Sequence, residues 1–326
     1  MMNQYPSLLT GIDFLIRIYI MSGISIRADK SHQALLKMQV FLNNNYFPVK
    51  NILLAVNAAK LEMNAIDFAC YIANLSHSKL TGVFLENIHE PRLPELRTFH
   101  GLPFVETIIA DDIPQNRKME KSFQNNIRLF NEACVNRGVS SCAHLDSNAP
   151  VQKVIAESRF ADVIILNTET SFESEPENTP TAFVKEVIAK SECPVILAPL
   201  SFEGIEDLLF AYDGSLSSVF AIKQFTYLFP ELKNKRVTIL HVEDESSQQP
   251  EKNQIEGLVK AHYADVSFHV LQGKAKDELF GYLLGKQNMF VVMGAFGRSM
   301  VSDLFRPSAA GLVVKVINLP IFIAHH

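Results

Sequence analysis

Apolar residues along the chain fall into short continuous runs that alternate with segments in which apolar positions recur at helical spacing. Short continuous apolar runs are typical of strands buried on both faces of a parallel sheet. They predict strands at residues 49–56, 80–85, 139–145, 161–166, 193–198, 205–212, 236–242, 266–271, 289–293 and 319–325. The helical spacing predicts helices at residues 61–76, 118–137, 150–157, 181–190, 219–228, 254–264, 274–284 and 309–317. This alternation predicts an α/β fold with an open, mainly parallel sheet covered on both faces.

The pattern of strands and helices occurs twice along the chain. Three ordered segments of the first half match segments of the second: 51–57 with 207–213, 80–86 with 237–243, and 194–199 with 320–325. The second copy is shorter after its second strand, and a proline-containing stretch of the first copy supplies much of the difference. The repeat predicts two tandem domains, at residues 48–200 and 204–326, after an N-terminal extension at residues 1–47.

The N-terminal extension lacks a clear membrane or secretion signal. Residues 8–26 are rich in apolar side chains, but Asp13 and Arg17 interrupt them. A membrane helix needs about 20 mostly apolar residues without central charges. The first residues also lack the basic region of a signal peptide. We therefore expect a cytoplasmic protein without a membrane span, and we keep Met21 or Met38 as a hypothesis for the natural start.

Composition narrows the functions that the chain can have. The formal net charge is −5 and there is no long basic run, so bulk electrostatics do not favour nucleic-acid binding. The four cysteines, at positions 70, 134, 142 and 193, have no CxxC spacing. We expect reduced structural thiols rather than a zinc site.

One segment has the features of an anion-binding loop. The predicted strand at residues 289–293 runs into Gly294, Gly297 follows, and Ser308 directly precedes the predicted helix at residues 309–317. Glycines let a phosphate approach the backbone, and a helix N-terminus offers free N–H groups. On spacing alone, however, such glycines are more often just a tight turn.

The second half combines three motifs in order. One strand ends in Asp-Gly-Ser at residues 213–215, the next ends in His-Val-Glu at residues 241–243, and the glycine pair with Ser308 follows. In this order they resemble the universal stress protein family, in a tandem form that covers residues 48–326. The resemblance implies two Rossmann-like domains, similar to adenine nucleotide alpha hydrolases, each with about five strands and four helices. One subclass of the family binds ATP through the glycine motif, and another does not.

The resemblance assigns a nucleotide site to the second half. The matching positions are Asp213, Gly214, Ser215, Val242, Gly294, Gly297, Arg298 and Ser308. The expected ligand is ATP, with Mg²⁺, or another adenine nucleotide. Pro307 departs from the ATP-binding pattern, which has glycine there, and proline has no N–H to give a phosphate. Arg298 and Arg306 would offset this loss if they faced the ligand.

The first half departs further from the nucleotide-binding pattern. Asn57 stands where the second half has an aspartate, Ala-Ala at residues 58–59 replaces Gly-Ser, and Asn-Thr-Glu-Thr at residues 167–170 replaces the glycine loop. Acidic side chains at positions 169, 173 and 175 would repel phosphates. We therefore expect the first half to bind no nucleotide and to serve as a partner for the second.

The resemblance also implies how the two domains associate. Family domains pair through their last strands, which here correspond to residues 195–197 and 321–323. A homodimer of tandem chains is a further association that the sequence leaves open.

Three functions fit these observations. The first is a cytoplasmic, nucleotide-responsive stress or signalling protein that is not a turnover enzyme. The second is a structural or protein-binding tandem module without a ligand. The third is a slow ATPase, although no general base stands at catalytic spacing. Asp213 is equally explained as a cap of the following helix, and His241 as a buried strand residue. No catalytic residue and no metal ligand is predicted.

Overall fold

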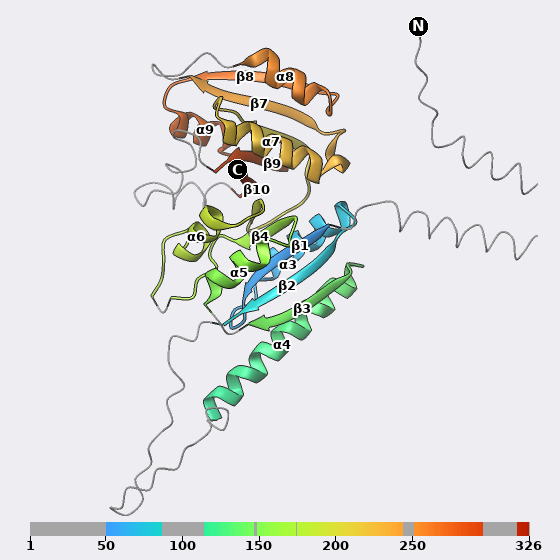
Figure 1. Cartoon of the computed structure of the whole chain (residues 1–326), viewed down its shortest axis with the longest axis vertical. Helices are drawn as coiled ribbons and strands as arrows, with labels where there is room; N and C mark the ends of the chain where they lie inside the picture. Colours follow the sequence, from blue (N-terminus) through green and yellow to red (C-terminus); the bar gives the residue numbers. More distant parts are fainter. Residues whose placement is uncertain are drawn as a thin grey trace, which may run out of the picture. The chain divides into compact units, whose positions relative to one another are not determined.

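A computed structural model describes residues 50–86, 114–146, 149–173, 175–243, 251–295 and 318–325 of the chain (Figure 1). All of these residues belong to one compact unit, Val49–His326. The N-terminal extension lies outside the described residues, and so do residues 89–113 and the helix predicted at residues 309–317. The domain boundaries at residues 48, 200 and 204 stay predictions.

The described strands form one ten-stranded sheet in the order β3-β2-β1-β4-β5-β10-β9-β6-β7-β8. Their bounds are β1 Asn51–Asn57, β2 Lys79–Leu85, β3 Ser141–Asp146, β4 Val163–Asn167, β5 Val195–Ala198, β6 Asp207–Ala211, β7 Arg236–Glu243, β8 Val266–Gln272, β9 Met289–Gly294 and β10 Ile321–Ala324. Every neighbouring pair is parallel except β5 and β10. The α/β fold with a mostly parallel sheet is therefore confirmed.

Helices cover both faces of this sheet (Figure 1). In the described residues they are α3 Met63–Leu75, α4 Pro114–Asn136, α5 Pro150–Ser158, α6 Ala182–Lys190, α7 Leu216–Leu228, α8 Lys252–Lys260 and α9 Ala275–Leu283, with a 3₁₀ turn at Pro230–Leu232. One apolar core holds α3, α4, α7 and α8 against one face, and a second holds α5, α6 and α9 against the other. No helix in these ranges has the length and apolar character needed to cross a bilayer.

The strand order repeats in the two halves of the sheet. The first half reads β3-β2-β1-β4-β5, and the second reads β8-β7-β6-β9-β10 when followed from its outer strand inward. In each half the chain first adds strands on one side of its first strand and then crosses back to add strands on the other side. The switch point therefore lies between β1 and β4 in the first half, and between β6 and β9 in the second. Ligands of open α/β sheets bind at the carboxyl ends of the strands that flank this switch point.

The two halves meet through the antiparallel pair β5 and β10. Phe322 pairs with Ile196, flanked by the pairs Ile321 with Leu197 and Ile323 with Val195. These are the segments at which the sequence places the joint between the halves. Because all other pairs are parallel, the carboxyl ends of the first-half strands and those of the second-half strands lie at opposite edges of the sheet. Pairing also covers two strand edges that would otherwise be open.

Aromatic side chains reinforce this joint on the face that carries α3 and α7. The Phe290 ring of β9 lies 5.0 Å from the Phe225 ring of α7 and 6.3 Å from the Phe68 ring of α3. Phe225 also lies 5.3 Å from Phe322 of β10. Edge-to-face rings at these distances stabilise a core beyond their buried area. The core is therefore continuous from one half to the other.

Element bounds differ from the sequence-based expectation mainly at helix starts. Helix α7 begins at Leu216 rather than at residue 219, because the Ser215 hydroxyl caps it by accepting the Ser218 N–H at 3.1 Å. Helix α8 begins at Lys252 and ends at Lys260, earlier than the predicted 254–264. After Lys260 the N–H groups of His262 and Tyr263 share the Val259 carbonyl, each at 3.0 Å.

Candidate functional site

At the end of β6, residues 213–215 form a tight turn that starts α7. The Asp213 carboxylate accepts the Ser215 N–H at 2.9 Å, and Gly214 has a φ of +77°, a conformation that favours glycine. Ser215 is the N-cap of α7. The motif therefore builds the turn and the helix start, with Ser215 rather than Asp213 as the cap. The second carboxylate oxygen of Asp213 has no hydrogen-bond partner among the described residues.

Gly294, the last residue of β9, lies under the start of α7. A Cβ atom at this position would come 2.5 Å from the Ser217 carbonyl carbon and 2.6 Å from the Ser218 nitrogen. These contacts are with backbone, which cannot move aside as a flexible side chain would. The glycine is thus required by the close approach of β9 and α7, whether or not a ligand binds.

Val242 lies on β7 just beyond the end of its pairing with β6. The Leu240 carbonyl accepts the Tyr212 N–H at 2.9 Å and so faces β6, while the Glu243 carbonyl accepts the Gly273 N–H at 3.0 Å on the β8 side. Because successive peptide groups of a strand face opposite sides, the N–H and C=O of Val242 face the β6 side. Neither group has a hydrogen-bond partner among the described residues. Among the described residues this leaves one donor and one acceptor at the end of β7, on the side of β6.

His241 and Tyr212 keep the end of this ladder open. Nδ1 of His241 lies 2.8 Å from the Tyr212 carbonyl oxygen, the acceptor that the Val242 N–H would need to extend the ladder. His241 is 2 % exposed, and its Nε2 has no partner among the described residues. Burial raises the pKa of the Tyr212 hydroxyl, and the nearby charges of Glu251 and Asp213 add to the effect. The sequence suggested that His241 is a buried strand residue, and the structure adds that its side chain occupies the Tyr212 carbonyl at the end of the β6–β7 pairing.

The rest of the predicted nucleotide site lies outside the described residues. This applies to Gly297, Arg298 and Ser308, and to Pro307, the departure from the family pattern. Asp213 and Gly294 do come together around the start of α7, with Val242 on the neighbouring strand β7. The structure therefore describes only part of the predicted site, and its nucleotide-binding role stays a prediction.

The equivalent position in the first half is closed. Strand β1 stays paired with β2 up to Asn57 and Leu85. The Ala58 N–H then donates to the Leu85 carbonyl at 2.9 Å. Leu85 is the counterpart of Val242 in the repeat, so the acceptor that is open in the second half is already used in the first. This agrees with the expectation that the first half binds no nucleotide, which stays a prediction.

Asn57 nevertheless holds the same turn as Asp213. Its side-chain oxygen accepts the Ala59 N–H at 2.8 Å, two residues on, as the Asp213 carboxylate accepts Ser215. Its amide nitrogen donates to the Ser171 carbonyl at 2.8 Å and so ties the end of β1 to the loop after β4. An asparagine therefore preserves this turn without a charge.

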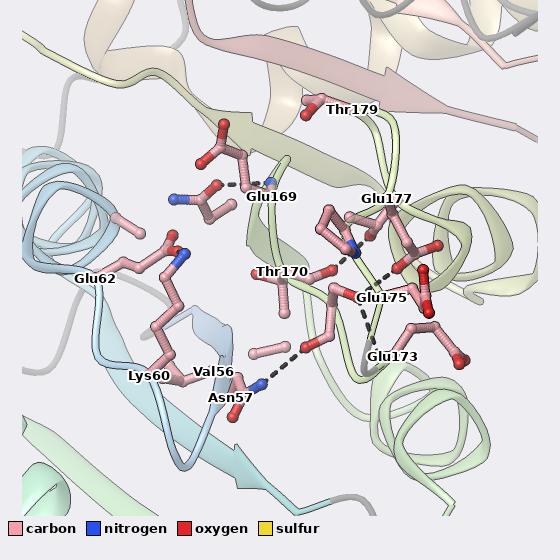
Figure 2. Close-up of a pocket in the computed structure, with 16 residues that line it drawn as sticks. Val56, Asn57, Lys60, Glu62, Glu169, Thr170, Glu173, Glu175, Glu177 and Thr179 are labelled. Carbon is pink, nitrogen blue, oxygen red and sulfur yellow. Dashed lines mark hydrogen bonds and ion pairs between the residues drawn. The ribbon is translucent and has the colours of Figure 1, made fainter.

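A cavity of about 460 Å³ opens at the first-half switch point, between the ends of β1 and β4 (Figure 2). Its lining includes one lysine, Lys60, and the five glutamates Glu62, Glu169, Glu173, Glu175 and Glu177. Helix α3 starts later after Asn57 than α7 does after Asp213, and the intervening loop forms one wall of this cavity. The sequence singled out Glu169, Glu173 and Glu175. It missed Lys60 and Glu62, whose only signal was the longer loop before α3.

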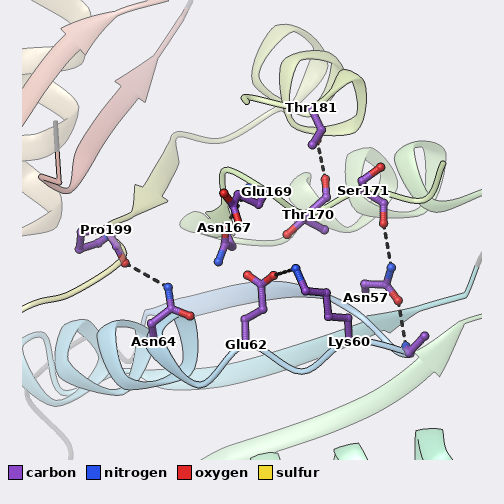
Figure 3. A network of polar contacts seen from close by, with 11 residues as sticks. Asn57, Lys60, Glu62, Asn64, Asn167, Glu169, Thr170, Ser171, Thr181 and Pro199 are labelled. Atoms are coloured by element: carbon purple, nitrogen blue, oxygen red, sulfur yellow. Dashed lines mark hydrogen bonds and ion pairs between the residues drawn. The ribbon is translucent and has the colours of Figure 1, made fainter. Parts of the chain in front are cut away.

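Some of these charges are already paired. Lys60 Nζ lies 2.7 Å from one carboxylate oxygen of Glu62, and this hydrogen bond raises the pKa of Lys60 (Figure 3). Glu177 accepts the Ala182 N–H at 2.9 Å and the Ser171 hydroxyl, so it fixes the loop to the start of α6. Within the described ranges, no group of three or more His, Cys, Asp or Glu side chains could hold a metal ion.

Comparison with known proteins identifies the fold. No protein-family profile matches the chain, and no curated protein matches it. Among solved structures, a universal stress protein from Archaeoglobus fulgidus DSM 4304 is similar to 86 % of this chain over 99 % of its own length, with a TM-score of 0.60 and 14 % identity. A putative universal stress protein from Pseudomonas aeruginosa UCBPP-PA14 is similar to 85 % of the chain over 93 % of its own length, with a TM-score of 0.49 and 14 % identity.

A shorter match covers half of the chain. The universal stress protein from Archaeoglobus fulgidus in complex with dAMP is similar to 47 % of this chain over 98 % of its own length, with 18 % identity and a TM-score of 0.30. The chain therefore has the fold of the universal stress proteins, as its motifs predicted, and the longer match spans both halves. Identities this low show the fold, and the ligand has to be argued from the residues of the site.

Proposed function

We propose that the chain is a cytoplasmic stress-response protein whose second half binds an adenine nucleotide, with ATP and Mg²⁺ as the first candidate. The observation that carries the proposal is the open pair of peptide groups on Val242. An N–H and a C=O that have no partner among the described residues match the ring nitrogen acceptor and the exocyclic amino donor along one edge of adenine. They lie at the carboxyl end of β7, next to β6, which borders the switch point where open α/β sheets bind ligands.

Asp213 is the second element of the proposed site. One of its carboxylate oxygens holds the turn to Ser215. The other oxygen remains to accept a ribose hydroxyl or a water on Mg²⁺, and such hydrogen bonds to a charged acceptor are stronger than neutral ones. The phosphates would extend toward Gly297 and Ser308, whose role rests on the sequence motif alone.

The proposed role is binding rather than turnover. The groups at the described end of the site are backbone amides, a carbonyl and one carboxylate that already holds a turn. Such groups hold a ligand in place, but they do not supply a general base aligned with a phosphoryl group. A slow ATPase remains an alternative, and it requires phosphate release above a buffer control that Asp213→Asn abolishes.

Calorimetry with ATP and Mg²⁺ on the full chain tests this proposal. We expect one molecule of ATP to bind per chain. Asp213→Asn should weaken binding by about tenfold, or ~1.4 kcal/mol, because the carboxylate is lost while the turn is kept. Asn57 shows that an asparagine holds this turn. The matched control is Asn57→Asp, which places a carboxylate at the closed position and should leave ATP affinity unchanged.

A second candidate function is a tandem interaction module without a nucleotide. It is favoured by Gly294, because the close approach of α7 explains this glycine without a ligand. It is also favoured by Pro307, which has no N–H to give a phosphate. Absence of heat with wild-type protein and ATP, ADP or AMP would establish this alternative over the nucleotide proposal.

A further inference from the structure

The cavity of the first half has the position and size of a ligand site that the nucleotide proposal does not use. It lies at the carboxyl ends of β1 and β4, and its volume of about 460 Å³ is within the range of small-molecule pockets. Ala55, Val56 and Asn57 of β1 and Asn167 at the end of β4 are among its lining residues, and Figure 2 shows Val56 and Asn57 beside the loop that carries Lys60.

Asn167 turns an unpartnered donor into this cavity. The residue is only 4 % exposed. Its side-chain oxygen accepts the Glu169 N–H at 2.8 Å, which fixes the orientation of the amide because an N–H requires the oxygen. The amide nitrogen has no partner among the described residues, and Figure 3 shows it directed toward the side chain of Glu62, which precedes α3. Because Asn167 lines the cavity, this nitrogen can donate to a ligand oxygen placed there.

Other polar groups around Asn167 are equally unused. Thr170 and Thr179 are 6 % and 5 % exposed, and neither hydroxyl has a hydrogen bond within the described ranges. The second carboxylate oxygen of Glu62 is buried and also has no partner there. The lining therefore offers an amide donor and hydroxyls for ligand oxygen atoms, together with carboxylates that favour a cation.

The charge of the lining excludes an anionic ligand. Five glutamates face one lysine, and that lysine is already paired with Glu62. A phosphate placed among them would be repelled, whereas a protonated amine would be attracted. A bare metal ion is disfavoured because the described carboxylates form no group of three or more that could ligate it.

We propose that the first-half cavity binds a small hydroxylated amine, protonated at neutral pH. Its ammonium group lies between Glu62 and Glu169, and its hydroxyls bond to the Asn167 amide and to the Thr170 and Thr179 hydroxyls. The proposal does not depend on nucleotide binding in the second half, because the two switch points lie at opposite edges of the sheet.

Calorimetry of the full chain at low ionic strength tests the proposal with two probes. Glucamine carries a primary amine and a row of hydroxyls, and sorbitol carries the hydroxyls with no amine. We expect glucamine to bind once per chain and sorbitol to bind at least about tenfold more weakly, since only the ammonium group pairs with the carboxylates. Equal binding of the two probes, or no binding of glucamine, overturns the proposal.

Two variants separate the site from general electrostatics. Glu169→Gln should weaken glucamine binding by about tenfold while leaving ATP titrations unchanged. Glu206→Gln removes the same charge from an exposed residue outside the cavity and should have no effect. Equal losses in both variants would show a bulk charge effect and overturn the site. A crystal structure grown with glucamine that shows only water beside Asn167 would overturn it as well, and unfolding curves of both variants exclude a loss of fold.

Discussion

The imidazole of His241 hydrogen-bonds to the carbonyl of Tyr212, with 2.8 Å between Nδ1 and the oxygen, and takes the place of the next rung of the β6–β7 ladder. This contact leaves the peptide groups of Val242 open and defines the end of the candidate site. A side chain thus ends the pairing of two parallel strands where a ligand could continue it.

His241→Phe should destabilise the protein by about 1–3 kcal/mol, because phenylalanine fills the space but leaves the buried Tyr212 carbonyl without its donor. Urea denaturation measures the change. His269→Phe, on the exposed side of β8, is the control and should change stability by less than about 0.5 kcal/mol. Wild-type stability in the His241 variant would show that the Tyr212 carbonyl finds another donor at no cost.

Gly294→Ala should destabilise the protein by about 1–3 kcal/mol or more, since its Cβ would clash with the backbone of Ser217 and Ser218. The matched control is Gly257→Ala in α8, where a Cβ meets no atom within 4 Å. That variant should gain about 0.5–1 kcal/mol from the lower flexibility of alanine in a helix. Chemical denaturation of both variants checks the pair, and equal stability of the two would contradict the close approach of β9 and α7.

Tyr263 should make the protein sensitive to alkali. Burial raises the pKa of its hydroxyl to about 12 from an ordinary value of 10.0, while a hydrogen bond to Thr226 acts in the opposite direction. A raised folded-state pKa means that its contribution to stability is fully present below pH 10 and is lost as pH rises through about 12. The loss approaches ~3 kcal/mol at about 1.4 kcal/mol per pKa unit.

The measurement for Tyr263 is the free energy of unfolding between pH 9 and 12 in wild type and in Tyr263→Phe. The variant should lose less stability over this interval than wild type does. Parallel curves for the two proteins would mean that Tyr263 does not titrate differently in the folded and unfolded states.

The four cysteines should differ sharply in reactivity. Cys70 and Cys134 are buried with their sulfurs 3.8 Å apart, and the Cys70 hydrogen bond lowers the pKa of Cys134 to about 7. Burial raises the pKa of Cys193 to about 12. Because alkylation needs an accessible thiolate, we expect iodoacetamide to modify Cys142 first in the native protein. Peptide mass spectrometry identifies the modified residue, and early labelling of Cys134 would show that its low pKa outweighs its burial.

Sequence pattern was sufficient for the fold because each strand of the repeat is a continuous apolar run. The resemblance to the universal stress proteins implied that residues 195–197 and 321–323 join the halves, and the structure pairs Ile196 with Phe322 there. The Asp-Gly-Ser motif likewise predicted a turn and a helix start at Asp213. These features depend on neighbours in sequence, which a single sequence displays directly.

The finer chemistry of the two switch points could not be predicted in this way. The need for Gly294 comes from the backbone of Ser217, far away along the chain. The closure of the first half depends on one hydrogen bond from Ala58 to Leu85, and the described residues of the second half contain no counterpart to it at Val242. Acidic residues at positions 169, 173 and 175 predicted repulsion of phosphates, but not the cavity they border, because a longer loop before α3 forms its other wall.

The antiparallel contact of β5 with β10 has a consequence for how this molecule can diverge. In a dimer of identical chains the same contact would lie on a two-fold axis, and every substitution would appear in both copies. Here the approximate two-fold axis relates two halves of one chain that differ in sequence. A substitution at the ligand-binding edge of one half therefore leaves the other half unchanged. The acidic lining around Asn167 and the glycine motif beginning at Gly294 are two independent outcomes of that freedom. One chain can in this way present two unlike chemistries, which a symmetric pair of single domains could not do.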